Sequence, residues 1–344
     1  MGLSRKGCAH EDRHRRAGIA GPTLAYWLCR YGHEPTLIEK APRLRTGGYV
    51  VDFWGGGYAV AERMGLAPEL HAAGYAVQEL RLVDRDSRKV GGFSAESFRR
   101  NLDGRFTSAA WYSGPNPDLR PTSATAWPPS KPRAIGRATK LVYLAYTTPG
   151  RMVARFAMRD DKTLFLFVFT ADQTRGPDPQ DSPEVKTTLS QVFGNAGWEC
   201  PEILRELDGS SEVYFDRVSQ IVMDHWSQGR AGLIGDAAAA VSLLAGEGTG
   251  LAMVQAYVLA GELSRAGADH PEAFRRYERR LRPIVEARQR SARAFASMFA
   301  PKTSLGLWTR NAASRLLDIP RVADWVIGRE FRDDIALPEY VAQR

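Results

Sequence analysis

The sequence has few cysteines and no long hydrophobic run. Its 344 residues include three cysteines, Cys8, Cys29 and Cys200, without metal-ligand or C-x-x-C spacing. This pattern argues against a disulfide framework or a metal site and indicates a reducing, cytoplasmic location. No apolar segment approaches the length that spans a bilayer, and the basic N-terminus precedes no apolar segment, so neither membrane insertion nor export is indicated.

Acidic residues are outnumbered: 47 Lys and Arg against 39 Asp and Glu give a net charge of +8. Much of the excess lies in an arginine-rich helical pattern at 271–293. A nucleic-acid-binding module would also need a recognition motif or exposed stacking aromatics, and we find no such motif. We therefore interpret this pattern as a solvated helix face and expect no nucleic-acid partner. With 44% hydrophobic residues the chain can bury one or two cores.

The most informative stretch is 231–253. An apolar run at 231–234 ends at Gly235-Asp236, which is typical of a buried strand that carries a carboxylate at its carboxyl end. Three alternate glycines, Gly246, Gly248 and Gly250, then precede a predicted helix at 251–263. Free amides at a glycine-lined helix start favour an electron-rich ligand. The carboxylate and the amides together suit a flavin, whereas the glycines alone could simply permit close packing.

A second glycine pattern lies near the N-terminus. Gly18 and Gly21 open a predicted helix, although Arg16 stands where a G-x-G-x-x-G pattern requires its first glycine. The polar residues at 7–16 predict that the preceding apolar strand is missing. A strand at 35–38 is followed by Glu39, which is placed to accept hydrogen bonds from a ribose.

The segment Gly235-Asp236-Ala237-Ala238 and the loop Ala245-Gly246-Glu247-Gly248 resemble those of FAD-dependent aromatic-ring hydroxylases. These are class A flavoprotein monooxygenases of the para-hydroxybenzoate hydroxylase and tetracycline-oxidase type. The resemblance covers roughly 17–108 and 139–344, and lapses in the proline-rich segment between.

The resemblance implies an α/β fold: a Rossmann-like, glutathione-reductase-type FAD-binding domain with an inserted antiparallel substrate domain and C-terminal helices. We place the FAD-binding domain at 17–76 and 224–300, and the substrate domain at 77–110 and 139–223. An irregular connection at 111–138 and terminal helices at 301–344 complete the division. In the substrate domain, alternation predicts a hairpin at 80–90. Strands are also predicted at 141–146 and 151–158, a near-continuous apolar strand at 163–170, and strand character at 212–223.

The resemblance also implies the cofactors and contacts. FAD is the cofactor, NAD(P)H the transient reductant, dioxygen a co-substrate, and the substrate a small aromatic, polycyclic or other electron-rich molecule. No acid–base catalytic residue is assigned, and the oligomeric state is not predicted. The expected contacts are Gly18, Gly21 and Glu39 for the adenosine half; Arg45 and Asp52 nearby; Gly235 and Asp236 for the ribityl chain; and Gly246, Gly248, Thr249, Gly250 and Leu251 for the flavin ring.

Two alternatives stay open. The missing first strand, Arg16 and the unrecognised middle would also fit a truncated relative that no longer holds FAD. A flavin-dependent reductase or dehydrogenase is the other, because flavin binding does not determine the reaction.

Overall fold

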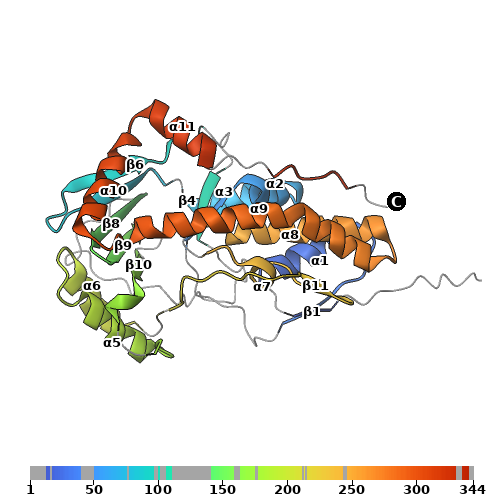
Figure 1. Ribbon diagram of the computed structural model, residues 1–344, viewed down its shortest axis with the longest axis horizontal. Helices are drawn as coiled ribbons and strands as arrows, with labels where there is room; N and C mark the ends of the chain where they lie inside the picture. Colours follow the sequence, from blue (N-terminus) through green and yellow to red (C-terminus); the bar gives the residue numbers. More distant parts are fainter. Residues whose placement is uncertain are drawn as a thin grey trace, which may run out of the picture.

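A computed structural model describes residues 13–15, 18–39, 50–75, 77–96, 100, 106–110, 141–158, 163–174, 177–210, 213, 215–242, 246–330 and 335–340. The molecule is elongated, with a five-stranded sheet at one end and long helices at the other (Figure 1). The proline-rich connection at 111–138 lies outside the described residues, and the division into domains stays a prediction. No helix in the described part is long and apolar enough to cross a bilayer.

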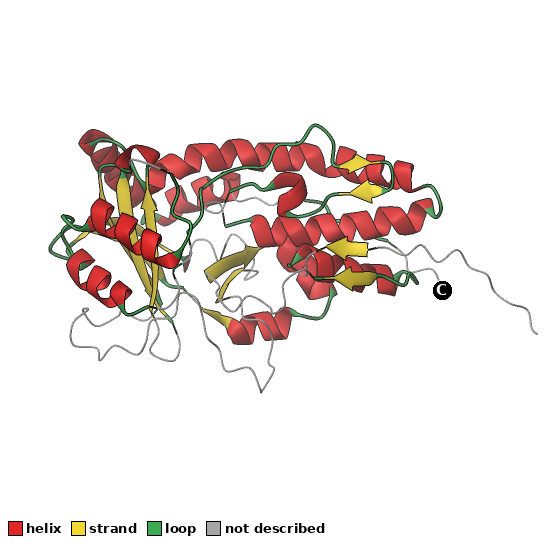
Figure 2. Cartoon of the chain, turned by 90° about the horizontal axis from the view of Figure 1, so that it is seen from below, coloured by secondary structure: helices red, strands yellow, loops and turns green. Residues whose placement is uncertain are grey.

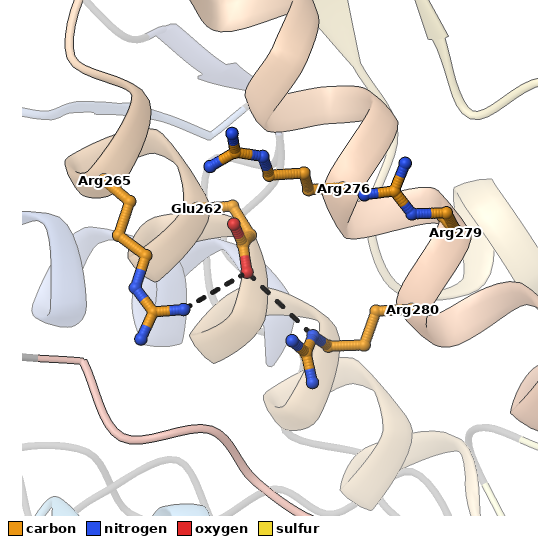
Figure 3. A pocket seen from close by; sticks show the side chains of 5 residues that line it. All are labelled: Glu262, Arg265, Arg276, Arg279 and Arg280. Carbon is orange, nitrogen blue, oxygen red and sulfur yellow. Dashed lines mark ion pairs between the residues drawn. The ribbon is translucent and has the colours of Figure 1, made fainter.

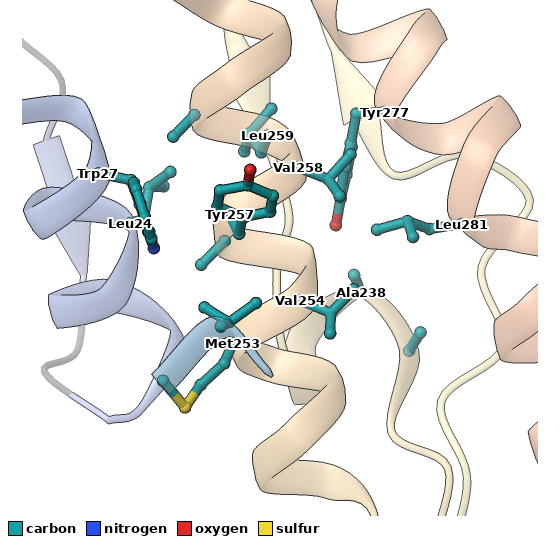
Figure 4. Close-up of a cluster of buried hydrophobic side chains, with 14 of the residues drawn as sticks. Leu24, Trp27, Ala238, Met253, Val254, Tyr257, Val258, Leu259, Tyr277 and Leu281 are labelled. Atoms are coloured by element: carbon teal, nitrogen blue, oxygen red, sulfur yellow. The ribbon is translucent and has the colours of Figure 1, made fainter. Parts of the chain in front are cut away.

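The helical end is built around α8 (Gly248–Ala266), which packs between α1 (Ala20–Arg30) and α9 (His270–Phe299), with α2 (Gly55–Arg63) also against it. Apolar and small residues occur on all sides of α8, so it is buried along nearly its whole length. Its side chains join the main core, where Trp27 of α1 meets Tyr257 of α8 edge to face (Figure 4). Tyr277 and Leu281 close this core from α9.

The first strand is present, so the prediction that it is missing is wrong. β1 (Arg13–Arg15) pairs in parallel with β2 (Thr36–Ile38), and Arg15 lies opposite Ile38. A strand is defined by its backbone ladder, and an apolar sequence is required only where both faces are covered. In β2, Leu37 and Ile38 are each 41% exposed, so this strand is not enclosed by other layers.

The five-stranded sheet contains β5 (Glu79–Val83), β6 (Lys89–Ser94), β8 (Val142–Thr148), β9 (Arg151–Ala157) and β10 (Thr163–Phe169). The predicted hairpin and the three later strands are confirmed. The strand order is β10-β9-β8-β5-β6, and β5 and β8 run parallel. The sheet is therefore mixed and not antiparallel as expected, because the connection after β6 returns the chain to the other side of β5 in the same direction.

Helices cover this sheet on one face and at one edge. α5 (Ser182–Phe193) and α6 (Cys200–Asp208) pack on one face through a core that includes Val153 and Phe193 (Figure 2). At the β6 edge, Ser314 of α10 (Ser304–Leu316) accepts a hydrogen bond of 3.0 Å from the Gly92 amide. The opposite edge is β10, where Leu166 is exposed.

The remaining elements connect these two ends. β3 (Val50–Trp54), β7 (Phe106–Ala110) and β4 (Gly74–Tyr75) form an antiparallel sheet in the order β3-β7-β4. Three further elements are α3 (Ala67–Ala73), the 3-10 turn η1 (Ala171–Gln173) and α11 (Pro320–Glu330). The chain enters α8 through β11 (Ser227–Gln228), β12 (Ala231–Gly232) and α7 (Asp236–Ala239).

The strand predicted at 212–223 does not form in the described residues of this segment. Its backbone finds other partners: the Ile221 amide donates to the Ala240 carbonyl, and Gln289 of α9 donates to the Ile221 carbonyl. Apolar alternation alone could not show that α9 side chains, and not a neighbouring strand, satisfy this backbone.

Candidate functional site

The N-terminal ends of α1, α2, α7 and α8 meet at one place. A Cβ placed on Gly235, just before α7, would lie 3.1 Å from the Cβ of Ala20 at the start of α1 and 3.7 Å from the Cβ of Ala252 in α8. The first turns of α2 and α8 touch through their backbones, because a Cβ on Gly57 would lie 2.2 Å from the Cα of Gly250. Glycine is therefore what allows these helix starts to converge.

The helix starts at this site leave their amide groups available. α1, α2 and α8 each begin without a side-chain cap and without an acidic residue in the first turn. By contrast, α5 and α9 each begin with an aspartate cap, Asp181 and Asp269, and a glutamate in the first turn. Among the described residues, neither a capping side chain nor a first-turn acid of these three helices neutralises their positive ends, which favours an anionic or electron-rich ligand.

Asp236 supplies the carboxylate of the site. It is the first residue of α7, and its Oδ1 atom would lie 3.7 Å from a Cβ placed on Gly248 at the start of α8. The side chain is exposed, yet the surrounding protein atoms desolvate the carboxyl group and raise its pKa above the ordinary value. Among the described residues, none donates a hydrogen bond to this carboxylate or pairs with it. Asp236 can therefore accept hydrogen bonds from the hydroxyl groups of a ligand.

A hydrogen bond to the buried side chain of Gln255 positions the Gly235-Asp236 turn. Gly235 adopts a φ of +63°, which glycine tolerates, and its amide donates to Oε1 of Gln255 at 2.8 Å. Tyr277 lies 3.1 Å from the same oxygen and 3.1 Å from the Leu233 carbonyl. Gln255 is 1% exposed. Sequence reasoning missed both residues, although a glutamine within an otherwise apolar helical run was a usable signal.

Arg288 of α9 holds the loop before α8. Its guanidinium group contacts the Glu247 carboxylate at 3.4 Å and lies over the Trp54 ring, 5.4 Å from its centroid. The Arg288 side chain is only 14% exposed. Arg282 is also largely covered and donates to the carbonyls of Met223 and Asp224. We predicted that the arginines of α9 form a solvated face. Arg288 and Arg282 do not, because they hold the loops next to the site.

The short apolar run before Gly235 is not a buried sheet strand. β12 covers only Ala231–Gly232, is exposed, and pairs antiparallel with β11. The Phe274 ring of α9 packs directly against Gly232 in this run, because a Cβ added to Gly232 would lie only 2.8 Å from that ring. The carboxylate predicted at the end of this run is still delivered to the helix starts.

Comparison with known proteins assigns the family. Residues 118–292 match the family model described as FAD binding domain. The chain belongs to the FAD-binding monooxygenase family. The match begins inside the proline-rich stretch, so the resemblance extends further into it than its motifs indicated.

Relatives and solved structures agree with this assignment. A flavin-dependent monooxygenase from an unidentified prokaryote is 28% identical over 333 residues, covering 79% of this chain and 85% of the relative. The crystal structure of tetracycline destructase Tet(55) matches with a TM-score of 0.71 and 25% identity, covering 96% of this chain and 98% of that chain. Klebsiella pneumoniae HpxO, solved with FAD and uric acid, matches with a TM-score of 0.69 and 16% identity, covering 92% and 97%. This chain is thus a flavin-dependent monooxygenase.

The predicted contacts of this monooxygenase near the N-terminus lie at the same end of the molecule as Asp236. Gly18 is exposed, and among the described residues no atom beyond its chain neighbours lies within 4 Å of a Cβ placed on it, so a ligand can approach its backbone closely. Gly21 is buried in the first turn of α1. Glu39 is exposed and directly follows β2, whose last residue lies opposite Arg15 just before the Gly18 loop.

The helix that carries the predicted flavin-ring contacts, α8, begins earlier than predicted. Gly246 has a φ of +67°, and α8 begins at Gly248, three residues earlier than predicted at Leu251. Gly248, Thr249 and Gly250 therefore form the first turn. The Leu251 amide donates to the Glu247 carbonyl at 3.0 Å and its side chain is buried. Its assignment as a flavin contact stays a prediction.

The remaining two predicted contacts concern the segment before α2. Asp52 lies in β3 opposite Ser108, and its side chain is outside the described part. Arg45 lies outside the described residues. Both assignments stay predictions.

We expect Asp236→Asn to stabilise the FAD-free protein at neutral pH. Because desolvation raises the pKa of this carboxyl group above 3.8, ionising it destabilises the folded state. This destabilisation is present above the raised pKa and is lost as the pH falls through it. Urea unfolding at pH 7 and near pH 4 should therefore show a stability difference between variant and wild type that shrinks at the lower pH. An equal difference at both pH values would contradict this assignment.

Proposed function

We propose that this monooxygenase uses NAD(P)H and dioxygen to hydroxylate a small aromatic, polycyclic or other electron-rich molecule. The observation that carries the proposal is the convergence of three uncapped helix starts beside the Asp236 carboxylate, which has no hydrogen-bond or ion-pair partner in the part of the chain that the structure describes. FAD, when bound there, supplies the redox and oxygen chemistry. The contribution of the chain is to bind, orient and exclude water.

The residues present fit FAD by their chemistry. The open backbone at Gly18 and the start of α1 suit a pyrophosphate, and Glu39 suits a ribose. Asp236 suits the ribityl hydroxyls. The amides of the first turn of α8 suit the electron-rich edge of the flavin ring, since α8 lacks a capping side chain. Gly246 supplies the left-handed turn that leads into this helix.

An apolar strip beside this site supports a ring-shaped, apolar substrate. Val218, Ile221, Val222 and Met223 are all exposed, and Val222 is 72% exposed. The strip is held in place, because Ile221 pairs with Ala240 in the loop between α7 and α8. Exposed apolar groups on a fixed backbone commonly mark a binding surface.

The relatives are consistent with such a substrate. One solved neighbour is named a tetracycline destructase, and another contains uric acid. We infer that this chain also acts on a small ring compound, whose identity must come from a screen.

Spectroscopy and turnover test the proposal. We expect the purified protein to be yellow, or to become so when FAD is added, and to oxidise NADPH faster when an accepted substrate is present. With isotopically labelled dioxygen, one labelled oxygen atom should appear in the product. A colourless protein that gains no flavin would favour the flavin-deficient alternative. NADPH oxidation without label in any product would favour a reductase or dehydrogenase.

A further inference from the structure

A cationic cavity of about 310 Å³ lies between the C-terminal half of α8 and the first half of α9 (Figure 3). We call it the arginine pocket. Its lining residues are Glu262, Arg265, Arg276, Arg279 and Arg280. Four cations and one anion thus surround a space that the proposed flavin site does not use. Glu262 lies fourteen residues after Gly248 along α8, which places it about 21 Å from the flavin end of that helix.

The guanidinium groups of the arginine pocket differ in how many hydrogen-bond and ion-pair partners they have. Arg276 pairs with Glu272 at 2.7 Å, and Arg265 donates to the Glu339 carbonyl at 2.7 Å while lying over the Tyr340 ring. Arg280 has only a 3.9 Å approach to Glu262. Arg279 has no hydrogen-bond or ion-pair partner among the described residues. The free donors are therefore concentrated on Arg279 and Arg280.

Glu262 anchors the floor of the pocket without saturating it. Its side chain is 3% exposed and its Oε1 accepts a 2.7 Å hydrogen bond from the Tyr340 hydroxyl. The approaches from Arg265 and Arg280 are both 3.9 Å, too long for hydrogen bonds. Because Arg276 pairs with Glu272, the Glu262 carboxylate is left to balance Arg265, Arg279 and Arg280. Arg279 and Arg280 also repel Arg276, at helical spacings of three and four residues. A bound anion would relieve this repulsion.

We propose that the arginine pocket binds a phosphate group, either as inorganic phosphate or as a phosphate monoester. The planar fork of a guanidinium group matches phosphate oxygens and can donate to two of them at once. The volume is at the lower end of that of small-molecule sites, which suits phosphate with a small attached group. The proposal is independent of the flavin chemistry, because it concerns a different end of α8.

Isothermal titration with sodium phosphate tests the proposal. The full chain, with FAD in every sample, is compared with Arg279→Ala and Arg280→Ala at an ionic strength held constant with chloride. We expect saturable one-site binding and about tenfold weaker affinity for each variant, the loss typical of one hydrogen bond to a charged group. Arg290→Ala is the matched control, because Arg290 is an exposed arginine of the same helix that does not line the pocket.

Glu262→Gln gives a result of opposite sign. Glutamine keeps an oxygen to accept the Tyr340 hydrogen bond but removes the negative charge on the floor of the pocket. We expect it to bind phosphate several-fold more tightly. A merely structural glutamate would show no such gain.

The source of the phosphate group is decided by comparing ligands. Tighter binding of NADP⁺ than of NAD⁺, lost in Arg279→Ala, would identify a phosphate monoester, whereas binding of inorganic phosphate alone would identify the free ion. An absence of saturable phosphate binding, or an equal loss in Arg290→Ala, would overturn the proposal. Flavin content and turnover are measured separately, so a protein without monooxygenase activity would not affect this result.

Discussion

Gly57→Ala is expected to lower the free energy of unfolding by about 3 kcal/mol or more, at or above the upper end of ordinary overpacking. The added methyl carbon would lie 2.2 Å from the Cα and 2.9 Å from the carbonyl carbon of Gly250. Both atoms belong to the backbone of α8, so no side-chain rotation can relieve the clash. α2 must move away from α8, which also separates two of the helix starts that form the site. Urea denaturation monitored by circular dichroism measures the loss.

Gly250→Ala is the matched control for this prediction. A methyl group added to Gly250 on α8 would fit, because its Cβ would lie 3.6 Å from the nearest described atom, the Cα of Gly57. We therefore expect little loss of stability in the FAD-free protein, apart from a small change in helix propensity that favours alanine. If both variants lose similar stability, the close approach of the two helices is not as described.

This asymmetry shows what the glycine pattern could and could not predict. Gly246, Gly248 and Gly250 correctly indicated a helix start that other groups approach closely. The sequence left open whether those groups belong to a ligand or to the protein. For Gly250 the nearest group is the backbone of α2, whereas at Gly18 the described part of the chain places no atom within 4 Å of an added Cβ, chain neighbours aside. Spacing along one segment carries no information on which distant segment packs against it.

The position of the carboxylate could be predicted, but not the groups that support it. Gly235-Asp236 follows a local rule, an apolar run ending in glycine and an acid. Gln255 and Tyr277 act across the fold, from positions that look like ordinary members of two helices. In the sequence, Arg288 is one of many arginines in a helical segment, and nothing there indicates that it lies over the Trp54 ring.

The prediction that the first strand is missing was wrong for a different reason. Hydropathy predicts strands that are enclosed by other layers, and β1 is paired only with the exposed β2 among the described residues. The polar residues Arg13–Arg15 therefore gave no signal, although their backbone forms the ladder that leads into the Gly18 loop.

Asp236→Ala is expected to weaken FAD binding by about 10- to 100-fold. The carboxylate has no hydrogen-bond partner among the described residues, so its acceptor capacity is available to the cofactor. Removing a charged acceptor of ligand hydroxyls costs about 1.5–3 kcal/mol, which corresponds to this range. Titration of the FAD-free protein with FAD, followed by the quenching of flavin fluorescence, measures the change. Asp224→Asn, an exposed aspartate of the preceding loop, should bind FAD like the wild type.

The stability of the same variants separates loss of binding from loss of folding. Because ionised Asp236 destabilises the FAD-free protein, its neutral replacement by asparagine should raise stability without cofactor and reduce the additional stability that FAD provides. A residue that only supports the fold would lower stability in both states. If Asp236→Asn proved less stable without FAD, or bound FAD as tightly as the wild type, the carboxylate would not be the group that receives the ribityl chain. A gain in stability without FAD, together with a smaller stabilisation by added FAD, is therefore the result that would establish Asp236 as a binding residue retained at the expense of stability.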